Sequence, residues 1–386
     1  MRRLALSLLL LLGAVVWWRW QDTAPITTRL TVAEALTGDT AGYARALVPR
    51  MFRFPEDHGP HPEFKTEWWY VTGNLRTPEG RPFGYQFTLF RIALAPSDPA
   101  DTVVVSAWRT RQLYMAHLTL SDIAEGRFYA FERFSRGALG LAGATARPFR
   151  AWLENWQLAQ VGENVFPWHL SAGTAEMQLN LTLRPLKPVV LQGKQGLDPK
   201  GPEPGNASYY YSIPRIATTG TLRIGRQTYT VEGLSWLDRE WSTSALGNDQ
   251  VGWDWFALQL DNGYDLMWYR LRHRDGAESP WSSGALIDPE GRLVHLQAGA
   301  VQLEVRDTWI SPHSKVTYPA AWYLRVPTQE LELYVRPRLK DQELNLSLRY
   351  WEGAVTVEGI HHGQSVQGSG YVELTGYGEA AWPGKL

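Results

Sequence analysis

Apolar and polar residues alternate with a period of two in several segments of the chain. Between Met177 and Leu183 every second residue is apolar and every intervening residue is polar. This spacing predicts a strand with one buried face, because successive side chains in a strand point to opposite sides. Residues 67–75 and 83–92 are rich in aromatic and β-branched residues and flank a Pro-Glu-Gly turn, which predicts a hairpin. Such segments recur between short turn signals without a long helical pattern, so we expect an all-β sandwich or barrel.

Two hairpin segments in different halves of the chain resemble each other. Residues 84–91 (GYQFTLFR) align without a gap to residues 263–270 (GYDLMWYR), and each segment follows a strand rich in Trp. The shared pattern is Gly-Tyr-x-apolar-x-apolar-aromatic-Arg, which indicates a diverged internal duplication. A chain of 386 residues also has room for two domains of about 150 residues each. We therefore expect two barrels, one over residues 51–235 and one over residues 236–386.

Residues 1–25 form a predicted targeting segment. Two Arg residues precede an uncharged apolar run, Leu4–Trp18, which has the length of a signal-peptide core and is short for a membrane span. The run lacks a small-residue cleavage site and ends in Trp residues around Arg19, which suit the headgroup edge of a membrane. The segment is therefore either a removed signal peptide or an uncleaved membrane-targeting helix in the inner membrane, and residues 26–50 form a tether with a short amphipathic helix. In both cases we expect the rest of the chain to lie outside the cytoplasm.

The composition narrows the chemistry. The chain has 19 Trp, 17 Tyr and 12 Phe residues, and such rings favour strands and also line ligand cavities. The formal net charge of -1 lacks the basic excess that a nucleic-acid partner requires. Cys is absent, which excludes a thiol nucleophile, a Cys-ligated zinc ion and disulfides. We expect most Trp residues to pack the barrel cores and a minority to line a cavity for an apolar ligand.

The clearest acid–base candidate lies in residues 236–242 (WLDREWS). In a strand, Asp238 and Glu240 point to one face, and Arg239 and Trp241 point to the other. Two neighbouring carboxylates walled by Trp rings have raised pKa values and suit general acid–base catalysis. The alternative is a structural network of ion pairs that closes one end of a barrel. The sequence leaves both interpretations open.

Other motifs carry less information. His117 lies in an alternating stretch and either faces a cavity or is a satisfied core residue. His58 and His61 are spaced like metal ligands but have no further ligand nearby, so we expect no metal site and no cofactor. The Gly- and Pro-rich residues 193–205 are predicted to form a surface loop or a lid over a cavity. Serine-hydrolase, zincin and nucleotide-binding functions lack support, because their motifs do not occur.

Residues 61–75 (HPEFKTEWWYVTGNL) and 83–91 (FGYQFTLFR) resemble the opening of a family of lipocalin-like, predicted secreted hydrolases. These AttH-like proteins are related to carotenoid 1,2-hydratase. The similarity continues in residues 236–242, 252–256, 350–355 and 370–377. The resemblance implies two lipocalin-like antiparallel β-barrels in tandem, export to the bacterial periplasm or cell surface, and a pocket for an isoprenoid- or lipid-like molecule.

The hydratase branch hydrates an isolated carbon–carbon double bond, and the resemblance implies residues for that activity. The branch has Asp-His-Asn-Trp-Gly where this chain has residues 238–242 (DREWS), so its histidine is replaced here. In an enzyme, Asp238 or Glu240 would donate the proton, while Tyr269 and Arg239 would orient a water. Trp241, Trp253 and Trp255 would stabilise the developing cation through their ring faces. The full expected substrate-binding set is Trp68, Tyr70, Arg91, His117, Arg239, Trp241, Trp253 and Trp255.

Three functions remain open at this stage. The first is a non-catalytic carrier of a lipid-like molecule, held at the membrane and serving a membrane transport system. The second is a metal-independent hydratase or hydrolase that acts on an isoprenoid or lipid, although no nucleophile supports hydrolysis. The third is a carbohydrate-binding or glycoside-cleaving protein, in which Trp platforms and paired carboxylates contact sugars. Enclosed Trp rings favour the first two functions, and rings exposed in a shallow cleft favour the third.

Overall fold

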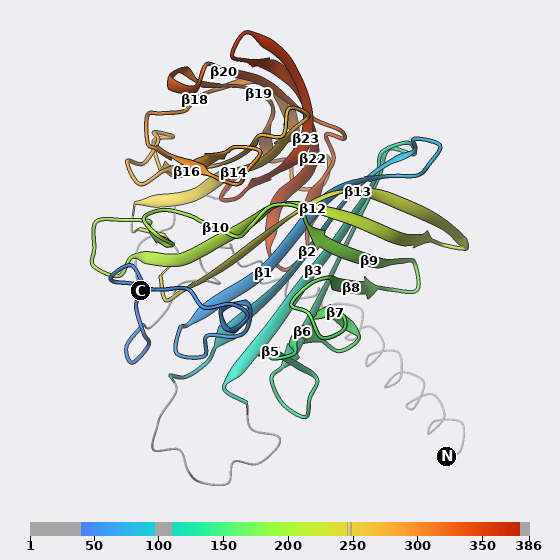
Figure 1. Cartoon of the computed structure of the whole chain (residues 1–386), viewed down its shortest axis with the longest axis vertical. Helices are drawn as coiled ribbons and strands as arrows, with labels where there is room; N and C mark the ends of the chain where they lie inside the picture. The colour runs from blue at the N-terminus through green and yellow to red at the C-terminus, as the bar shows by residue number, and fades with distance from the viewer. Residues whose placement is uncertain (1–39, 97–109, 245, 248, 379–386) are drawn as a thin grey trace, which may run out of the picture.

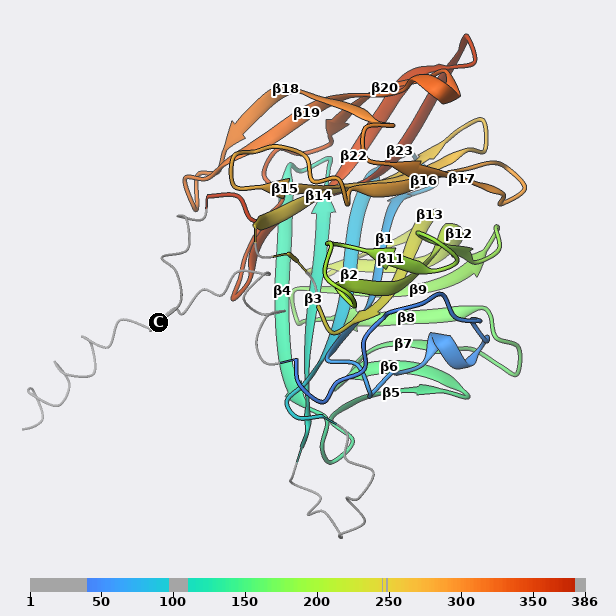
Figure 2. The same ribbon diagram turned by 90° about the vertical axis from the view of Figure 1, so that its left-hand side faces the viewer.

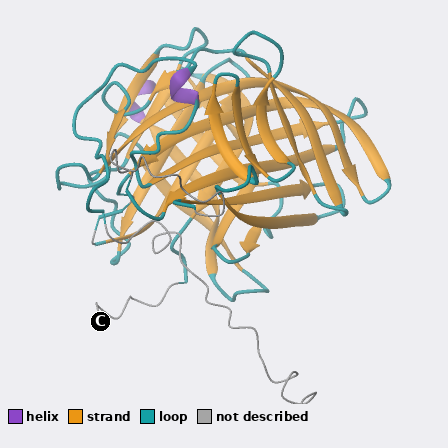
Figure 3. Ribbon diagram, turned by 90° about the horizontal axis from the view of Figure 1, so that it is seen from below, coloured by secondary structure: helices purple, strands orange, loops and turns teal. Residues whose placement is uncertain are grey.

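A computed structural model describes residues 40–96, 110–244, 246–247 and 249–378. Within these ranges the chain is almost entirely β-structure, arranged in two antiparallel sheets that each curl into a barrel-like shape (Figures 1 and 2). The helical elements in the same ranges are two 3₁₀ turns, η1 (Glu56–His58) and η2 (Pro327–Gln329), which Figure 3 shows beside the strands. No helix in the described ranges is long and apolar enough to span a membrane. The predicted targeting segment lies outside the described residues, as does most of the tether.

The first sheet has 13 strands in the order β4-β3-β2-β1-β13-β12-β9-β8-β7-β6-β5, with β10 and β11 paired to β12. Its strands are β1 (Thr66–Arg76), β2 (Pro82–Ala93), β3 (Gln112–Asp122), β4 (Arg127–Arg136), β5 (Ala142–Ala146), β6 (Phe149–Leu153), β7 (Trp156–Gln160), β8 (Trp168–Gly173), β9 (Met177–Pro185), β10 (Val190–Leu191), β11 (Leu197–Pro199), β12 (Ala207–Ile224) and β13 (Gln227–Ser242). The predicted hairpin is confirmed as β1 and β2, and the predicted half-buried strand is confirmed as β9.

The second sheet has 10 strands in the order β17-β16-β15-β14-β23-β22-β20-β19-β18, with β21 paired to β22. Its strands are β14 (Gln250–Leu260), β15 (Asp265–His273), β16 (Ser283–Ile287), β17 (Leu293–Gln297), β18 (Gln302–Ile310), β19 (Thr317–Val326), β20 (Leu331–Pro337), β21 (Glu343–Asn345), β22 (Arg349–His361) and β23 (Gln364–Leu374). The change of sheet falls between Ser242 and Gln250, later than the expected boundary at residue 235, because β13 pairs with β1 and β12 up to Ser242.

The two halves share a plan that matches the sequence repeat. In the first sheet β1 to β4 form a meander and β13 returns to pair with β1, and in the second sheet β14 to β17 form a meander and β23 returns to pair with β14. The aligned arginines occupy equivalent register positions: Arg91 lies opposite Glu67, and Arg270 lies opposite Asp254. Each of these two acids forms an ion pair with its cross-strand arginine. The repeated sequence therefore corresponds to a repeated hairpin with an equivalent acid–arginine pair, which is fully buried in the first half and half-buried at Arg270 in the second.

Side chains fill the interior of both barrels. The first interior holds large rings, among them Trp69, Trp156 and Trp168, and the second holds Trp268 and Trp322. All five of these Trp side chains are fully buried. Close packing of this kind stabilises each barrel through the removal of apolar surface from water. A third buried cluster lies between the sheets and contains residues of both halves, which is where the functional site is found.

Candidate functional site

A cavity of about 100 Å³ lies at the seam between the two sheets. It draws its walls from both halves: β1, β2, β12 and β13 on one side, and β14, β15, β22 and β23 on the other. The lining residues are Trp68, Tyr70, Thr88, Phe90, Lys200, Tyr210, Asp238, Glu240, Ser244, Trp253, Trp255, Tyr269, Leu271, Leu348, Tyr350 and Glu373. The cavity therefore combines aromatic walls with buried ionisable groups.

Strand alternation decides which residues reach this seam. In β1, Tyr70 faces the seam, whereas its neighbours Trp69 and Val71 face the interior of the first barrel. In β13, Asp238 and Glu240 line the cavity, as the alternation predicts. The outer face of the first barrel is thus as buried as its inner face here, because the second sheet covers it. The predicted placement of the carboxyls of Asp238 and Glu240 on one face is confirmed.

Asp238 is held by three hydrogen bonds. Its Oδ2 accepts from the Tyr210 hydroxyl at 2.6 Å, and its Oδ1 accepts from the Ser212 hydroxyl at 2.5 Å and from Nε1 of Trp236 at 2.6 Å. Burial raises the pKa of Asp238 to about 7, although the three hydrogen bonds favour the ionised form and partly oppose this rise. The carboxyl is therefore fixed in position and exchanges its proton near neutral pH.

Lys200, from the Gly- and Pro-rich segment, enters the same cavity. Its Nζ lies 2.6 Å from Oδ2 of Asp198 and 3.4 Å from Oε1 of Glu240. Burial alone would lower the pKa of Lys200, but the two carboxyls raise it well above its usual value, so the ammonium stays charged. Burial raises the pKa of Glu240, and Lys200 opposes that rise. The segment 193–205, which was predicted to form a surface loop or a lid over a cavity, therefore contributes Lys200 to the cavity wall.

Tyr269, a predicted site residue, lines the cavity beside Lys200. Its hydroxyl donates to Oδ2 of Asp198 at 2.7 Å, and the Lys200 Nζ lies 3.9 Å from the centroid of its ring. Because Asp198 already accepts from the lysine, the three groups form one connected polar cluster. This cluster fixes Lys200 and Tyr269 in the cavity wall.

The second sheet contributes a carboxyl pair that the sequence analysis did not select. Glu352 on β22 lies directly across from Glu373 on β23. The Tyr70 hydroxyl donates to Oε1 of Glu352, and Nε1 of Trp253 donates to Oε1 of Glu373 at 2.6 Å. Burial raises the pKa of Glu373 to about 7, and burial together with Glu373 raises the pKa of Glu352 well above its usual value. The signal available in the sequence was a glutamate between apolar and aromatic residues in each strand, Glu352 after Tyr350 and Trp351 and Glu373 after Tyr371 and Val372.

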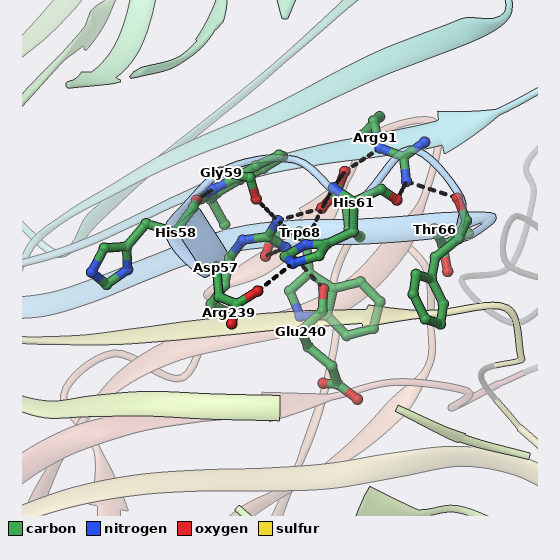
Figure 4. A network of polar contacts seen from close by, with 12 residues as sticks. Asp57, His58, Gly59, His61, Thr66, Trp68, Arg91, Arg239 and Glu240 are labelled. Carbon is green, nitrogen blue, oxygen red and sulfur yellow. Dashed lines mark hydrogen bonds and ion pairs between the residues drawn. The ribbon is translucent and has the colours of Figure 1, made fainter. Parts of the chain in front are cut away.

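Three expected binding residues lie on the other face of the first sheet. Arg91 and Arg239 both form ion pairs with the buried carboxylate of Glu67, inside the first barrel (Figure 4). Trp241 stacks on the ring of His61 with 3.7 Å between the ring centroids. Figure 4 shows the Glu240 carboxyl pointing away from this network. The expectation that Arg239 orients a water and Trp241 stabilises a cation in the cavity is therefore wrong, because alternation turns both toward the barrel interior.

The remaining expected binding residues lie in the cavity wall or directly behind it. His117 lies behind the cavity wall rather than in it, with its Nδ1 2.7 Å from the hydroxyl oxygen of Tyr350. The other expected binding residues, Trp68, Tyr70, Trp253 and Trp255, do line the cavity. Within the described ranges, no three His, Asp or Glu side chains converge as the ligands of one metal ion would.

The fold and the site together define a lipocalin-like, double-barrel protein with an acid-lined aromatic pocket at the seam of its halves. The model of the AttH-like family matches residues 45–377, and the chain belongs to this family. The crystal structure of an AttH protein from Nitrosomonas europaea is 34% identical with a TM-score of 0.76, and the match covers 86% of this chain and 99% of that chain.

Two curated relatives carry names that describe reactions with water. The dehydratase asqC of Emericella nidulans is 26% identical over 219 residues, and kievitone hydratase of Fusarium solani subsp. phaseoli is 23% identical over 221 residues. These matches cover 52% and 55% of this chain, and they span about three fifths of the length of each relative. The crystal structure of kievitone hydratase from Nectria haematococca shares the fold, with a TM-score of 0.63, 16% identity and coverage of 86% of this chain and 96% of that chain. The chain is thus homologous to a hydratase and a dehydratase.

Proposed function

We propose that this protein is a hydro-lyase that adds or removes water at a carbon–carbon double bond of an apolar, isoprenoid- or lipid-like molecule. The observation that carries the proposal is the placement of Asp238 and Glu373, one from each half, around one aromatic cavity with pKa values of about 7. A carboxyl with such a pKa both donates and accepts a proton near neutral pH. The names of the two curated relatives support the same class of reaction.

The residues suggest a simple sequence of steps. In the hydration direction, Asp238 gives its proton to one carbon of the double bond, and the π electrons form the new C–H bond. The cation left on the second carbon lies beside the electron-rich faces of Trp253 and Trp255. A water attacks this carbon, and Glu373 accepts the proton that the water loses, so an alcohol forms. Dehydration is the same sequence in reverse, with Asp238 and Glu373 exchanging roles.

The enclosure of the rings favours an apolar ligand over a sugar. Trp255 is buried, and Trp68 and Trp253 are half-buried between the two sheets. Sugar platforms instead need rings that are open to solvent in a shallow cleft. The same enclosure also suits a carrier that holds its ligand unchanged, so the reaction assay below separates the two functions.

The cellular location of the protein, outside the cytoplasm and at the inner membrane, is part of the same proposal. The apolar run Leu4–Trp18 with its basic start supports export, and the Trp residues around Arg19 support an anchor in the inner membrane. An anchored protein would meet apolar ligands where they dissolve. A membrane transport system is a further partner that fits such a position.

The test is incubation of the full chain in oxygen-18 water with a panel of prenylated and polyene compounds and their alcohols. Mass spectrometry of the extracted compounds then detects the gain of one labelled water by an alkene or the loss of one unlabelled water from an alcohol. We expect time-dependent conversion of at least one compound that the protein binds. Compounds that bind tightly and remain unchanged would contradict the hydro-lyase proposal and favour the carrier function.

A further inference from the structure

A buried histidine connects the cavity wall to the protein surface. His117 lies on β3, on the face that packs against the second sheet, and its side chain is fully buried. Its Nδ1 is 2.7 Å from the hydroxyl oxygen of Tyr350, whose ring lines the cavity. Tyr350 and Glu352 are two residues apart on β22, so they lie on the same face of that strand. One imidazole nitrogen therefore faces Tyr350 in the cavity wall, and Tyr350 shares a face of β22 with Glu352, one member of the carboxyl pair.

The other imidazole nitrogen faces a carboxylate that reaches solvent. Nε2 of His117 lies 3.9 Å from Oε2 of Glu132, its cross-strand neighbour on β4. The Glu132 side chain is 25% exposed, and the backbone N–H of Ser347 donates to its carboxylate at 3.1 Å. Oε2 also accepts from the Ser347 hydroxyl, so proton transfer between Nε2 and Glu132 requires a rotation of this part-exposed side chain that shortens the gap. Glu132, His117 and Tyr350 thus form a line from solvent to the cavity.

The imidazole of His117 is neutral and has one donor and one acceptor nitrogen, which suits it to pass a proton on. Burial lowers the pKa of His117 to about 3, so the ring is neutral. A neutral imidazole has one donor and one acceptor nitrogen. Nε2 has no hydrogen-bond partner among the described residues, and an unpaired buried polar atom costs free energy that an apolar residue here would avoid. A purely structural role for His117 does not account for this arrangement.

We propose that Glu132, His117 and Tyr350 form a proton relay between solvent and the carboxyl pair Glu352–Glu373. The inference rests on the proposed acid–base role of Glu373. In the outward direction, a proton from the pair passes to the Tyr350 oxygen as the Tyr350 hydroxyl proton passes to Nδ1 of His117. The Nε2 proton of His117 passes to the Glu132 carboxylate, and solvent water takes it. One proton leaves the site, and a transfer in the opposite direction restores the first tautomer of the imidazole.

The test measures proton exchange rather than turnover. The full chain is mixed rapidly with D₂O, and time-resolved infrared spectroscopy follows the C=O band of the buried acid as its proton is replaced by deuterium. Glu352→Gln and Glu373→Gln assign the band. We expect the exchange to slow roughly tenfold or more in His117→Phe and in Tyr350→Phe, while the final band position stays unchanged. His117→Gln, which retains a polar group beside Tyr350 but cannot pass a proton through a ring, should behave like His117→Phe.

A matched control lies in the first barrel. His58 is also buried, and its Nδ1 is 2.6 Å from the hydroxyl oxygen of Tyr211, but neither residue lines the cavity. His58→Phe should leave the exchange rate at the wild-type value. Wild-type exchange in both folded His117 variants would overturn the relay. Because the readout needs no turnover, slowed exchange supports the relay even in a protein without hydro-lyase activity, and turnover with unchanged exchange counts against the relay alone.

Discussion

Asp238 and Arg239 are adjacent in β13, and their side chains lie on opposite sides of the first sheet. Asp238 lines the cavity at the seam, whereas Arg239 forms an ion pair with Glu67 inside the first barrel. The period of two in a strand forces this separation. One strand therefore supplies the site on one face and a buried ionic network on the other. The network fixes the position of β13, and β13 in turn fixes Asp238.

Glu67 is the centre of that network, so its replacement should destabilise the protein strongly. Burial would raise its pKa, but Arg239 and Arg91 lower it far below the usual value, so the carboxylate is charged. Glu67→Gln leaves two buried guanidinium groups without a charge partner, and we expect a loss of about 3–5 kcal/mol in the free energy of unfolding. Chemical denaturation measures this loss. Glu232→Gln, which removes an exposed ion pair with Arg76, should unfold near the wild-type midpoint.

The raised pKa values predict a pH dependence of stability. In the folded protein the pKa of Asp238 rises from 3.8 to about 7 and that of Glu373 from 4.5 to about 7, in both cases through burial. Between about pH 4 and pH 7 the two carboxyls bind protons in the folded state but not in the unfolded state. Their contribution to the free energy of unfolding is therefore greatest below about pH 4 and is lost as pH rises through about 7. The double variant Asp238→Asn, Glu373→Gln should show a flatter profile of unfolding free energy between pH 4 and 7. An unchanged slope would count against the raised pKa values.

Gly84 allows the two halves to approach each other. A Cβ at this position would lie 2.6 Å from the Cβ of Ala354 and 2.9 Å from the Tyr371 hydroxyl oxygen, both in the second sheet. Gly84→Ala should therefore force the sheets apart and lower the free energy of unfolding by about 1–3 kcal/mol. Differential scanning calorimetry measures the change. Gly247→Ala adds a Cβ whose nearest neighbours lie at 3.5 Å, so its melting temperature should match the wild type.

Trp255 tests whether the seam cavity binds apolar molecules. Trp255 lines the cavity, and removal of its ring should weaken binding of the fluorescent probe 1-aminoanthracene about tenfold in Trp255→Ala. Trp322 lies inside the second barrel, away from the cavity lining. Trp322→Phe should keep the wild-type affinity even where it lowers the melting temperature. Equal losses in both variants would show that the probe responds to overall stability instead of the cavity.

Much of the fold and part of the site followed from local patterns. Alternation predicted the hairpin of β1 and β2, the repeat predicted two related halves, and the same alternation placed Asp238 and Glu240 on one face. Local patterns fail where a site needs long-range information. Arg239 was expected to orient a water although alternation already placed it on the face opposite Asp238, and the side chains of both Arg91 and Arg239 belong to the barrel interior.

Three site residues that the sequence analysis did not select, Lys200, Glu352 and Glu373, also depend on long-range contacts. Glu352 and Glu373 become neighbours only when β22 pairs with β23, and Glu373 shares a cavity with Asp238 only when the second sheet packs on the first. Lys200 reaches the cavity from a segment whose composition indicates a loop. Each of these groups was visible as a charged residue in an apolar or Gly-rich context. Its partner could not be read from a single sequence, because the partner comes from another strand or the other half.

The most direct test of the central claim compares Asp238→Asn with the wild type in both turnover and ligand binding. Labelled-water incorporation measures turnover of a converted compound, and 1-aminoanthracene fluorescence measures occupancy of the cavity. We predict that Asp238→Asn lowers turnover by about 10²-fold or more and leaves probe affinity near the wild-type value, because the amide keeps the shape of the carboxyl but has no acidic proton. A variant that turns over at the wild-type rate would contradict the proposed role of Asp238 at the seam.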